Sequence, residues 1–297
     1  MPTQTPETPV AAPHGTAATS EPVQHWALRD LPPFPSIAVK LLQLLSDEDV
    51  QVKRLIELLR SDAALCAELL RRANSALYGA RTQVSSLQQG LVLLGLDQVR
   101  SLAMAVALGS YVKSAMRIAA LRRCWRHSLA TALLSERLAH AVHFEADRAY
   151  TAGLLHDIGL LGLMVNNPKE YANLLLVSRE NGFDIRVTEQ AMFDVDHCEA
   201  GAWLARQWAF PEEILNSVRH HHDPIDYSQY GLLAITQSAV LLSDVLGFGV
   251  IPPSETGADP SPYEALRLQF PAAAQDCLPL RMEVLQDFLT QRINAYE

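Results

Sequence analysis

The sequence predicts an all-α protein, a multi-helix bundle with an N-terminal and a C-terminal helical subdomain. Apolar residues recur at about the 3.6-residue period of an amphipathic helix over most of the chain. No run alternates convincingly between apolar and polar residues, so neither strands nor hairpins are expected. Apolar residues make up 49% and charged residues 19% of the 297 residues, which is typical of a globular protein rather than a disordered one.

The first half is expected to start with a disordered tail and to continue as short helices. Residues 1–24 are rich in Pro, Thr and Ala and offer no periodic apolar face. The phrase Leu31-Pro-Pro-Phe-Pro follows, and Pro is favoured just ahead of a helix. Apolar residues at helical spacing then predict helices around residues 37–45, 55–59 and 65–70.

Two further helices of the first half have recognisable ends. Ser86 followed by Gln89 is a capping box, and it opens an apolar run that continues to Leu94. Gly95 ends this run, and residues 96–111 supply the next helix.

The second half is expected to hold longer helices. Amphipathic stretches predict them at about residues 115–142, 147–165, 168–181, 198–209, 211–221 and 230–247. The Pro-, Ser- and Gly-rich residues 251–262 predict a loop before a final helix at about 279–295. With a soft boundary near residues 113–118, the predicted organisation is a tail (1–24), two helical halves (25–115 and 116–250), and a loop with a C-terminal helix (251–297).

Charge, hydropathy and cysteine spacing argue against several classes of protein. The chain carries 24 basic and 33 acidic residues, a formal charge of −9, so a nucleic-acid partner is not expected. The longest apolar run, Gly153 to Val165, is interrupted by His156-Asp157, so no membrane span is expected. The cysteines lie far apart without a C-x-x-C pair, which predicts packed, unbridged thiols at Cys66, Cys124, Cys198 and Cys277. A soluble, cytoplasmic protein is therefore expected.

Side chains that commonly bind metals interrupt the apolar helices of the second half. They are His127, His156, Asp157, His197, His221, His222 and Asp244. Imidazoles and carboxylates together suit Fe, Mn, Zn or Mg, and the share of imidazole favours a transition metal. Helical bundles build metal sites from ligands on several helices, and a buried Asp244 among leucines would need a metal or a histidine as compensation. The set is therefore a candidate metal site.

Each of these residues also has a simpler interpretation. His127 can be a packed helical histidine bonded to a backbone carbonyl, and His197 can belong to a helix N-cap after Asp196. The histidines at 220–222 can end a helix, where the helix dipole favours them. Asp244 can sit at a helix end that faces solvent. Only the order of the whole set favours a metal site.

Two other motifs point weakly to nucleic acid or phosphate. Residues 86–99 have the pattern of a helix-turn-helix, but the second helix offers only Arg100 early on, so DNA reading is not expected. Basic residues Arg122, Arg123 and Arg126 flank His127 and could meet a phosphate, although a solvated basic face is the simpler interpretation.

The order of a His, a His-Asp pair and a late helical Asp resembles the metal quartet of the HD phosphohydrolase superfamily. The helix-initial His197 with Gly201, followed by His221-His222, further resembles the HD-GYP branch. Over about residues 26–250, a more specific set of phrases resembles the HDOD family, the HD-related output domains of bacterial signalling. These phrases are Leu31-Pro-Pro-Phe-Pro, Asp62-Ala-Ala-Leu, Arg72-Ala-Asn-Ser-Ala-Leu-Tyr-Gly, Val84-Ser-Ser-Leu-Gln-Gln-Gly, Leu93-Leu-Gly-Leu, Trp208-Ala-Phe-Pro and His221-His-Asp-Pro.

The HDOD resemblance implies an all-α domain with an HD-like second half, a regulatory role, and usually no established catalytic activity. It places the HD quartet at His127, His156, Asp157 and Asp244. The Lys that follows His-Asp-Ile-Gly in the catalytic HD-GYP branch is Leu160 here, and Ile225-Asp-Tyr-Ser replaces the Gly-Tyr-Pro stretch. Loss of the Lys removes a cation that could stabilise charge developing on a phosphate.

Three functions remain open at this point. The one we favour is a non-catalytic signalling module that acts in trans on separate signalling proteins through an apolar surface of the first half. The second is a metal-dependent phosphohydrolase for a nucleotide or cyclic dinucleotide, in which Asp157 bridges the quartet's metal to a second one at His197 and His221 or His222. The third keeps the metal as a structural or sensing site without turnover.

Overall fold

The computed structural model describes residues 25–45, 52–74, 84–252 and 261–296. Within these ranges the chain forms helices joined by turns and contains no strand, so the all-α prediction is confirmed. The predicted tail at 1–24, and most of the phrase from Arg72 to Gly79, lie outside the described residues.

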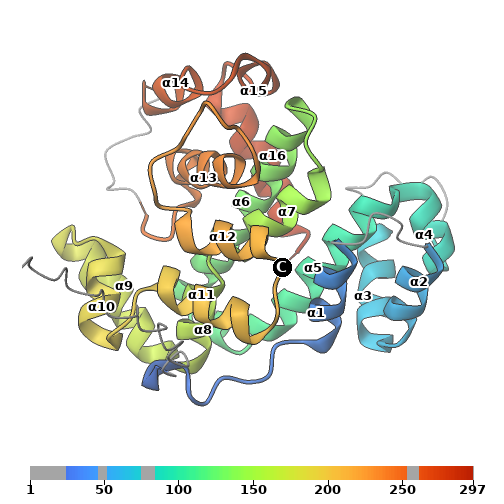
Figure 1. The fold of residues 1–297 in the computed structure, drawn as a ribbon, viewed down its shortest axis with the longest axis horizontal. Helices are drawn as coiled ribbons and strands as arrows, with labels where there is room; N and C mark the ends of the chain where they lie inside the picture. The colour runs from blue at the N-terminus through green and yellow to red at the C-terminus, as the bar shows by residue number, and fades with distance from the viewer. Residues whose placement is uncertain (1–24, 46–51, 75–83, 253–260, 297) are drawn as a thin grey trace, which may run out of the picture.

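The first half forms a group of helices on one side of the molecule (Figure 1). The bounds of its helices are α1 (Ser36–Leu45), α2 (Val52–Arg60), α3 (Ala63–Ala73), α4 (Leu87–Leu94) and α5 (Leu96–Val112). Helix α5 contacts α1, α3 and α4 on one side and α7 (Ala146–Leu155) on the other. It therefore carries the packing of the first half over to the second.

The predicted capping box opens α4 in a shifted form. The hydroxyl oxygen of Ser86 accepts a hydrogen bond from the backbone N–H of Gln89, with N and Oγ 3.2 Å apart. The Gln89 side chain reaches one residue further back than the usual box and accepts from the backbone N–H of Ser85 at 2.7 Å. The bond to Gln89 satisfies an amide that the first turn of the helix leaves without an intrahelical partner, and the bond from Ser85 ties the residue before the cap to that turn.

Asn74 ties the end of α3 to the segment ahead of α4. Its Nδ2 donates to the carbonyl oxygens of Leu70 and Val84, at 2.8 and 2.7 Å, and its Oδ1 accepts from the backbone N–H of Val84 at 2.7 Å. The two bonds to Val84 join positions ten residues apart. The Asn side chain thus acts as a backbone-like clamp across this connection.

We expect Asn74→Ala to lower the free energy of unfolding by about 1–3 kcal/mol, because it removes both bonds to Val84 and the bond to Leu70. Asn181→Ala is the matched control, since Asn181 makes only a local bond to the Val177 carbonyl near the end of its helix. Urea unfolding followed by circular dichroism measures both variants. Equal, small losses for the two would show that Asn74 does not act as a clamp.

The second half is built around the long helix α6 (Ala119–Ala141). It packs against α7 and against α13 (Leu232–Ser243), while α8 (Ile158–Asn166) packs against α11 (His197–Gln207). The other elements of this half are η3 (Ala115–Arg117), α9 (Pro168–Asn181), α10 (Ile185–Phe193), α12 (Glu212–His220) and the π-helical turn η4 (Asp244–Phe248).

The single helix predicted over residues 147–165 is wrong, because α7 ends at Leu155 and α8 begins at Ile158. The apolar residues on both sides are buried, so the apolar run continues across the break and the sequence pattern gives no sign of it. His156 and Asp157 form the turn between the two helices. The break therefore falls on the two residues with ligand-type side chains.

Aromatic residues from separate parts of the chain lock the two halves together. The ring of Phe34, in the Pro-rich phrase before α1, stacks on Trp208 with ring centroids 4.3 Å apart and an interplanar angle of 12°. Phe210 and Tyr111 complete the cluster around Phe34. Two of the phrases noted in the sequence thus meet in space, and their aromatic residues serve the core.

The C-terminal residues add three helices to the second half: α14 (Ser261–Arg267), α15 (Ala272–Cys277) and α16 (Met282–Asn294). The last corresponds to the predicted final helix, whereas α14 and α15 were not predicted. Helices α15 and α16 both pack against α6. The four cysteines are free thiols.

Within the described ranges, no single helix has both the length and the hydropathy needed to cross a membrane. Among the helices that the structure describes, α4 and α5 taken together reach that composition, but they are bent by 118° with respect to each other.

Candidate metal centre

The structure brings the predicted ligand side chains together from five places in the second half. His127 comes from the middle of α6, and His156 and Asp157 from the break between α7 and α8. His197 opens α11, as predicted, with Asp196 as its N-cap. The remaining ligands stand at helix ends: His221 and His222 after α12, and Asp244 after α13.

The first cluster consists of His127, His156 and Asp157, all buried. The Nε2 atoms of the two histidines lie 3.2 Å apart. Oδ2 of Asp157 lies 3.6 Å from Nε2 of His127 and 3.3 Å from Nε2 of His156. Close packing of α6 on α7 produces this approach: a Cβ added to Gly153 of α7 would lie 2.8 Å from the Thr131 carbonyl oxygen of α6.

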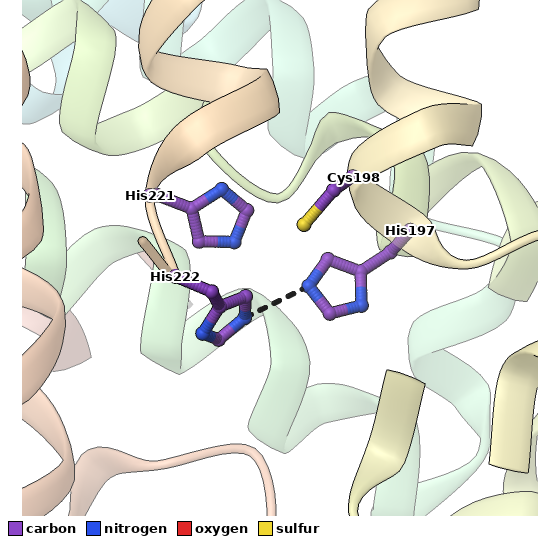
Figure 2. Close-up of side chains that lie close together, drawn as sticks. All are labelled: His197, Cys198, His221 and His222. Carbon is purple, nitrogen blue, oxygen red and sulfur yellow. Dashed lines mark hydrogen bonds between the residues drawn. The ribbon is translucent and has the colours of Figure 1, made fainter. Parts of the chain in front are cut away.

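The second cluster consists of His197, His221 and His222, with Cys198 beside them (Figure 2). Nε2 of His197 lies 3.0 Å from Nε2 of His222. Asp157 also reaches this cluster, because its Oδ1 lies 3.6 Å from Nε2 of His197 and 3.3 Å from Nε2 of His221. One carboxylate therefore faces both clusters, each oxygen toward a different group of imidazoles.

Hydrogen bonds to backbone carbonyls fix the tautomers of two of these histidines. A carbonyl oxygen only accepts, so Nδ1 of His156 donates to Gly153 at 2.7 Å and Nδ1 of His221 donates to Val218 at 2.8 Å. In the neutral rings this leaves a lone pair on each Nε2, directed at the carboxylate of Asp157. Nε2 of His221 is buried and has no hydrogen-bond partner within the described residues.

Lone pairs and carboxylate oxygens are all acceptors, so they cannot satisfy one another. A cation between them would satisfy every one. Imidazole nitrogens held by a second hydrogen bond, together with a shared carboxylate, form the donor set that a divalent transition metal prefers. The residues present therefore fit a metal ion.

The pKa values of the carboxylate and of three of the imidazoles are both shifted downward in the centre. Burial alone would raise the pKa of Asp157, but His156 and the other histidines around it hold that pKa well below its usual range. Burial lowers the pKa of His127 to about 3, of His221 to about 4 and of His222 to about 2. At neutral pH the carboxylate of Asp157 is thus ionised and the rings of His127, His221 and His222 are neutral, which are the protonation states that metal ligands need.

Asp244 lies at the rim of the centre. The sequence suggested a buried carboxylate at this position, but the side chain is half exposed. It follows the last residue of α13, and 52% of its side chain is exposed. Its Oδ1 is 3.8 Å from Nδ1 of His127, which also lies 3.1 Å from Oγ of Ser243. Desolvation by the surrounding protein, with repulsion from Asp157, raises the pKa of Asp244 to about 7. The interpretation as a helix-end residue is therefore correct, and it is compatible with a place beside His127.

Glu189 is a member of the centre that the sequence analysis missed. It is completely buried on α10, and its Oε2 accepts from Nδ1 of His197 at 2.6 Å and from the His197 backbone N–H at 2.9 Å. The hydroxyl of Tyr171 donates to its other oxygen. Burial would lower the pKa of His197, but Glu189 raises it well above its usual value. Glu189 orients the ring so that Nε2 points at Asp157.

We expect Glu189→Gln to weaken metal binding by about 10- to 100-fold, since carboxylates that orient ligating histidines typically contribute that much. The amide keeps the size of the side chain, but its acceptor is weaker and its NH₂ group can face the ring. Competition with a coloured chelator measures the affinity. Glu199→Gln, on an exposed position of α11, is the matched control and should bind as the wild type does. Equal metal affinities of the two variants would show that Glu189 does not contribute to metal binding.

A cavity of about 350 Å³ opens over the ligands. Its polar lining consists of residues from the centre, including Asp157, Asp244 and His222. Its other walls are apolar, and Leu160 occupies the position where the catalytic branch carries Lys. Within the described lining there is no lysine or arginine.

The family of this chain follows from a match to a family model. Residues 31–224 match the family model of the HDOD domain. The chain belongs to the HDOD family. The match spans all of the candidate ligands except Asp244, and it includes the aromatic cluster around Phe34.

Solved structures of related proteins share this fold. An HDOD domain protein of unknown function from Geobacter sulfurreducens superimposes with a TM-score of 0.69, with 24% identity over 91% of this chain and 92% of that one. A protein from Shewanella amazonensis SB2B, suggested to be a phosphohydrolase, gives a TM-score of 0.62 with 24% identity over 92% of this chain and 96% of that one. At this level of identity the likeness concerns the fold.

Two curated proteins match parts of the sequence. An uncharacterised protein of Treponema pallidum is 29% identical over 196 residues, which are 65% of this chain and 38% of that protein. Ribonuclease Y of Thermus thermophilus is 31% identical over 99 residues, which are 33% of this chain and 12% of the enzyme. The chain therefore spans well under half the length of either relative.

Proposed function

We propose that this HDOD protein is a signalling output module whose HD-type centre holds a transition metal ion without hydrolysing a phosphate ester. The converging lone pairs around Asp157 support metal binding. The cavity over the ligands argues against turnover. Its described walls are apolar apart from the ligands and contain no cation.

Hydrolysis of a phosphate ester requires positive groups around the phosphoryl oxygens as charge develops on them. A bound metal ion would supply Lewis acidity at one of these oxygens. The described walls of the cavity offer Leu160, Ile185 and Val240 and no further cation. Such walls exclude water and shield a metal, but they neither orient a phosphate group nor neutralise it.

An exposed apolar surface on the first half supports action on a separate protein. On α4, Val92 is 89% exposed and Leu93 is 47% exposed. Neighbouring apolar side chains that face solvent mark places where proteins associate. We therefore propose that the module acts in trans through this helix. The metal centre in the other half then has a structural or a sensing role.

Turnover by metal-loaded protein tests this function. Wild type and Asp157→Asn are each supplied with Mn, Fe or Zn and assayed with bis-p-nitrophenyl phosphate, ATP and a cyclic dinucleotide. The proposal predicts the same background rate for both proteins with every substrate. Metal-dependent turnover in the wild type that disappears in Asp157→Asn would overturn it.

One observation favours the alternative, a metal-dependent phosphohydrolase. Asp157 faces both histidine clusters, and a carboxylate shared by two clusters suits a pair of ions that activate a water and clamp a phosphate. The cavity over them leaves room for a small substrate group. The same assay decides between the two functions.

A further inference from the structure

A second cavity, of about 1140 Å³, lies on the surface of the second half. The start of α6, the turn η3, helix α9 and the segment after η4 surround it. Val250 lines both this cleft and the cavity over the metal centre, so the two are neighbours. None of the candidate metal ligands lines the cleft.

The described lining of this cleft carries basic side chains and no carboxylate. The basic residues are Lys113, Arg117, Arg122, Arg123, Arg126 and Arg179. This concentration is opposite in sign to the chain as a whole, whose formal charge is −9. A net acidic chain that gathers cations around one concave surface creates a local positive potential there.

Most of these cations have no carboxylate partner among the described residues. Lys113, Arg117, Arg122 and Arg179 form no ion pair with a carboxylate in the part of the chain that the structure describes. Arg123 is used differently, because it donates to the carbonyl oxygens of Gly247 and Gly249, at 2.7 Å each. The basic side chains of the cleft repel one another, and a bound anion with several negative charges would relieve this repulsion.

The position of α6 adds further donors to the same surface. Ala119 and Ala120, in the first turn of this 23-residue helix, line the cleft, and Ile118 provides no side-chain cap. Backbone N–H groups at such a helix start attract anions. The cleft thus combines side-chain cations and the positive end of a helix dipole on one wall.

The floor of the cleft is apolar and aromatic. Trp125, Leu175 and Tyr296 are buried beneath it, and Met116 and Leu176 add apolar surface at its sides. A cleft with cations around an apolar floor suits a ligand that has phosphate groups and a flat, apolar part. Its volume of about 1140 Å³ slightly exceeds the usual range of small-molecule sites, about 300–1,000 Å³.

We propose that this cleft binds a nucleotide carrying a di- or triphosphate. The phosphates contact Arg117, Arg122 and Arg179, and the base lies on the apolar floor. Binding takes place without a metal in the HD-type centre, so it is independent of the function proposed above. The basic residues at the start of α6 are then a ligand site rather than a solvated face.

Titration calorimetry with ATP, pyrophosphate and adenosine tests the site, on the full chain treated with EDTA and in low salt. ATP and pyrophosphate should bind to saturation, and adenosine should bind far more weakly than ATP. The double variant Arg122→Glu, Arg179→Glu should weaken ATP binding by about 100-fold, since a charged hydrogen bond to phosphate is worth about tenfold or more in affinity. Added KCl should weaken binding of both phosphate probes.

The matched control is Arg206→Glu, Arg219→Glu, which reverses two exposed arginines that do not line the cleft. It should bind ATP within about twofold of the wild type, because distant surface charges are largely screened. Circular dichroism melts show whether all variants are folded. Three results would overturn the proposal: no saturable ATP binding by the wild type, equal losses in both double variants, or binding that requires metal and disappears in Asp157→Asn.

Discussion

Replacing Gly159 by Ala is expected to lower the free energy of unfolding by about 3 kcal/mol or more and to abolish metal binding. Gly159 lies in the first turn of α8, against the backbone of α11. A Cβ at this position would lie 2.0 Å from the carbonyl oxygen of His197 and 2.4 Å from the backbone nitrogen of Gly201. Backbone atoms cannot move aside as a side chain can, so the two helices must separate.

The same contact holds the two histidine clusters together, because α8 follows Asp157 and α11 begins with His197. Gly231→Ala is the matched control: no atom lies within 4 Å of the added Cβ, and φ is −99°. It should lose no more than about 1 kcal/mol and keep its metal. Urea unfolding and metal analysis measure both variants. A folded Gly159→Ala protein with the wild-type metal content would contradict the helix contact described above.

Asp157→Asn is expected to have the largest effect on metal binding with little change of shape. The carboxylate faces His127, His156, His197 and His221, and the amide keeps its volume while removing its charge. We expect the affinity for Zn²⁺ or Mn²⁺ to fall by at least about 100-fold, since a lost ligand should cost at least as much as a lost orienting partner. Chelator competition measures the change.

Thermal unfolding gives an independent readout of the same variant. An ion that binds only the native state stabilises it by about 2.7 kcal/mol at a hundredfold excess over its Kd. Added metal should therefore raise the Tm of the wild type and leave that of Asp157→Asn unchanged. Asp223→Asn, which changes an exposed carboxylate paired with His220 beside the histidine run, should respond as the wild type does. A metal-induced rise of the Tm in Asp157→Asn as large as in the wild type would show that this carboxylate does not bind the metal.

The helices and the ligand residues could be predicted because each leaves a mark in the local sequence. Helical spacing of buried leucines marked α2 and α3, and polar residues inside apolar stretches marked His127 and the His156-Asp157 pair. The order of these residues along the chain was informative because an HD-type centre collects one or two ligands from each of several helices.

Other features depend on tertiary contacts and could not be predicted. The break between α7 and α8 is hidden because apolar residues continue on both sides of His156. Asp244 is half exposed because α13 ends just before it. Glu189 could have been found, since it lies between Ile185 and Phe193 at helical spacing, a carboxylate on an apolar stripe. Its partner, however, is eight residues away and across a turn.

The basic cleft illustrates the same limit. The arginines at the start of α6 are visible in the sequence, but Arg179 joins them only because α9 packs beside α6. Local charge patterning alone therefore indicated a solvated face. The concave surface that favours a bound anion exists only in the folded chain.

The metal content of the wild-type protein, purified without added metal and measured by elemental analysis, tests the central claim most directly. The converging imidazoles and the ionised Asp157 predict about one or two transition-metal ions per chain, because a set of deprotonated ligands binds a divalent ion strongly at neutral pH. A content below about 0.1 ion per chain, in protein that also takes up no metal when it is supplied, would contradict the metal centre.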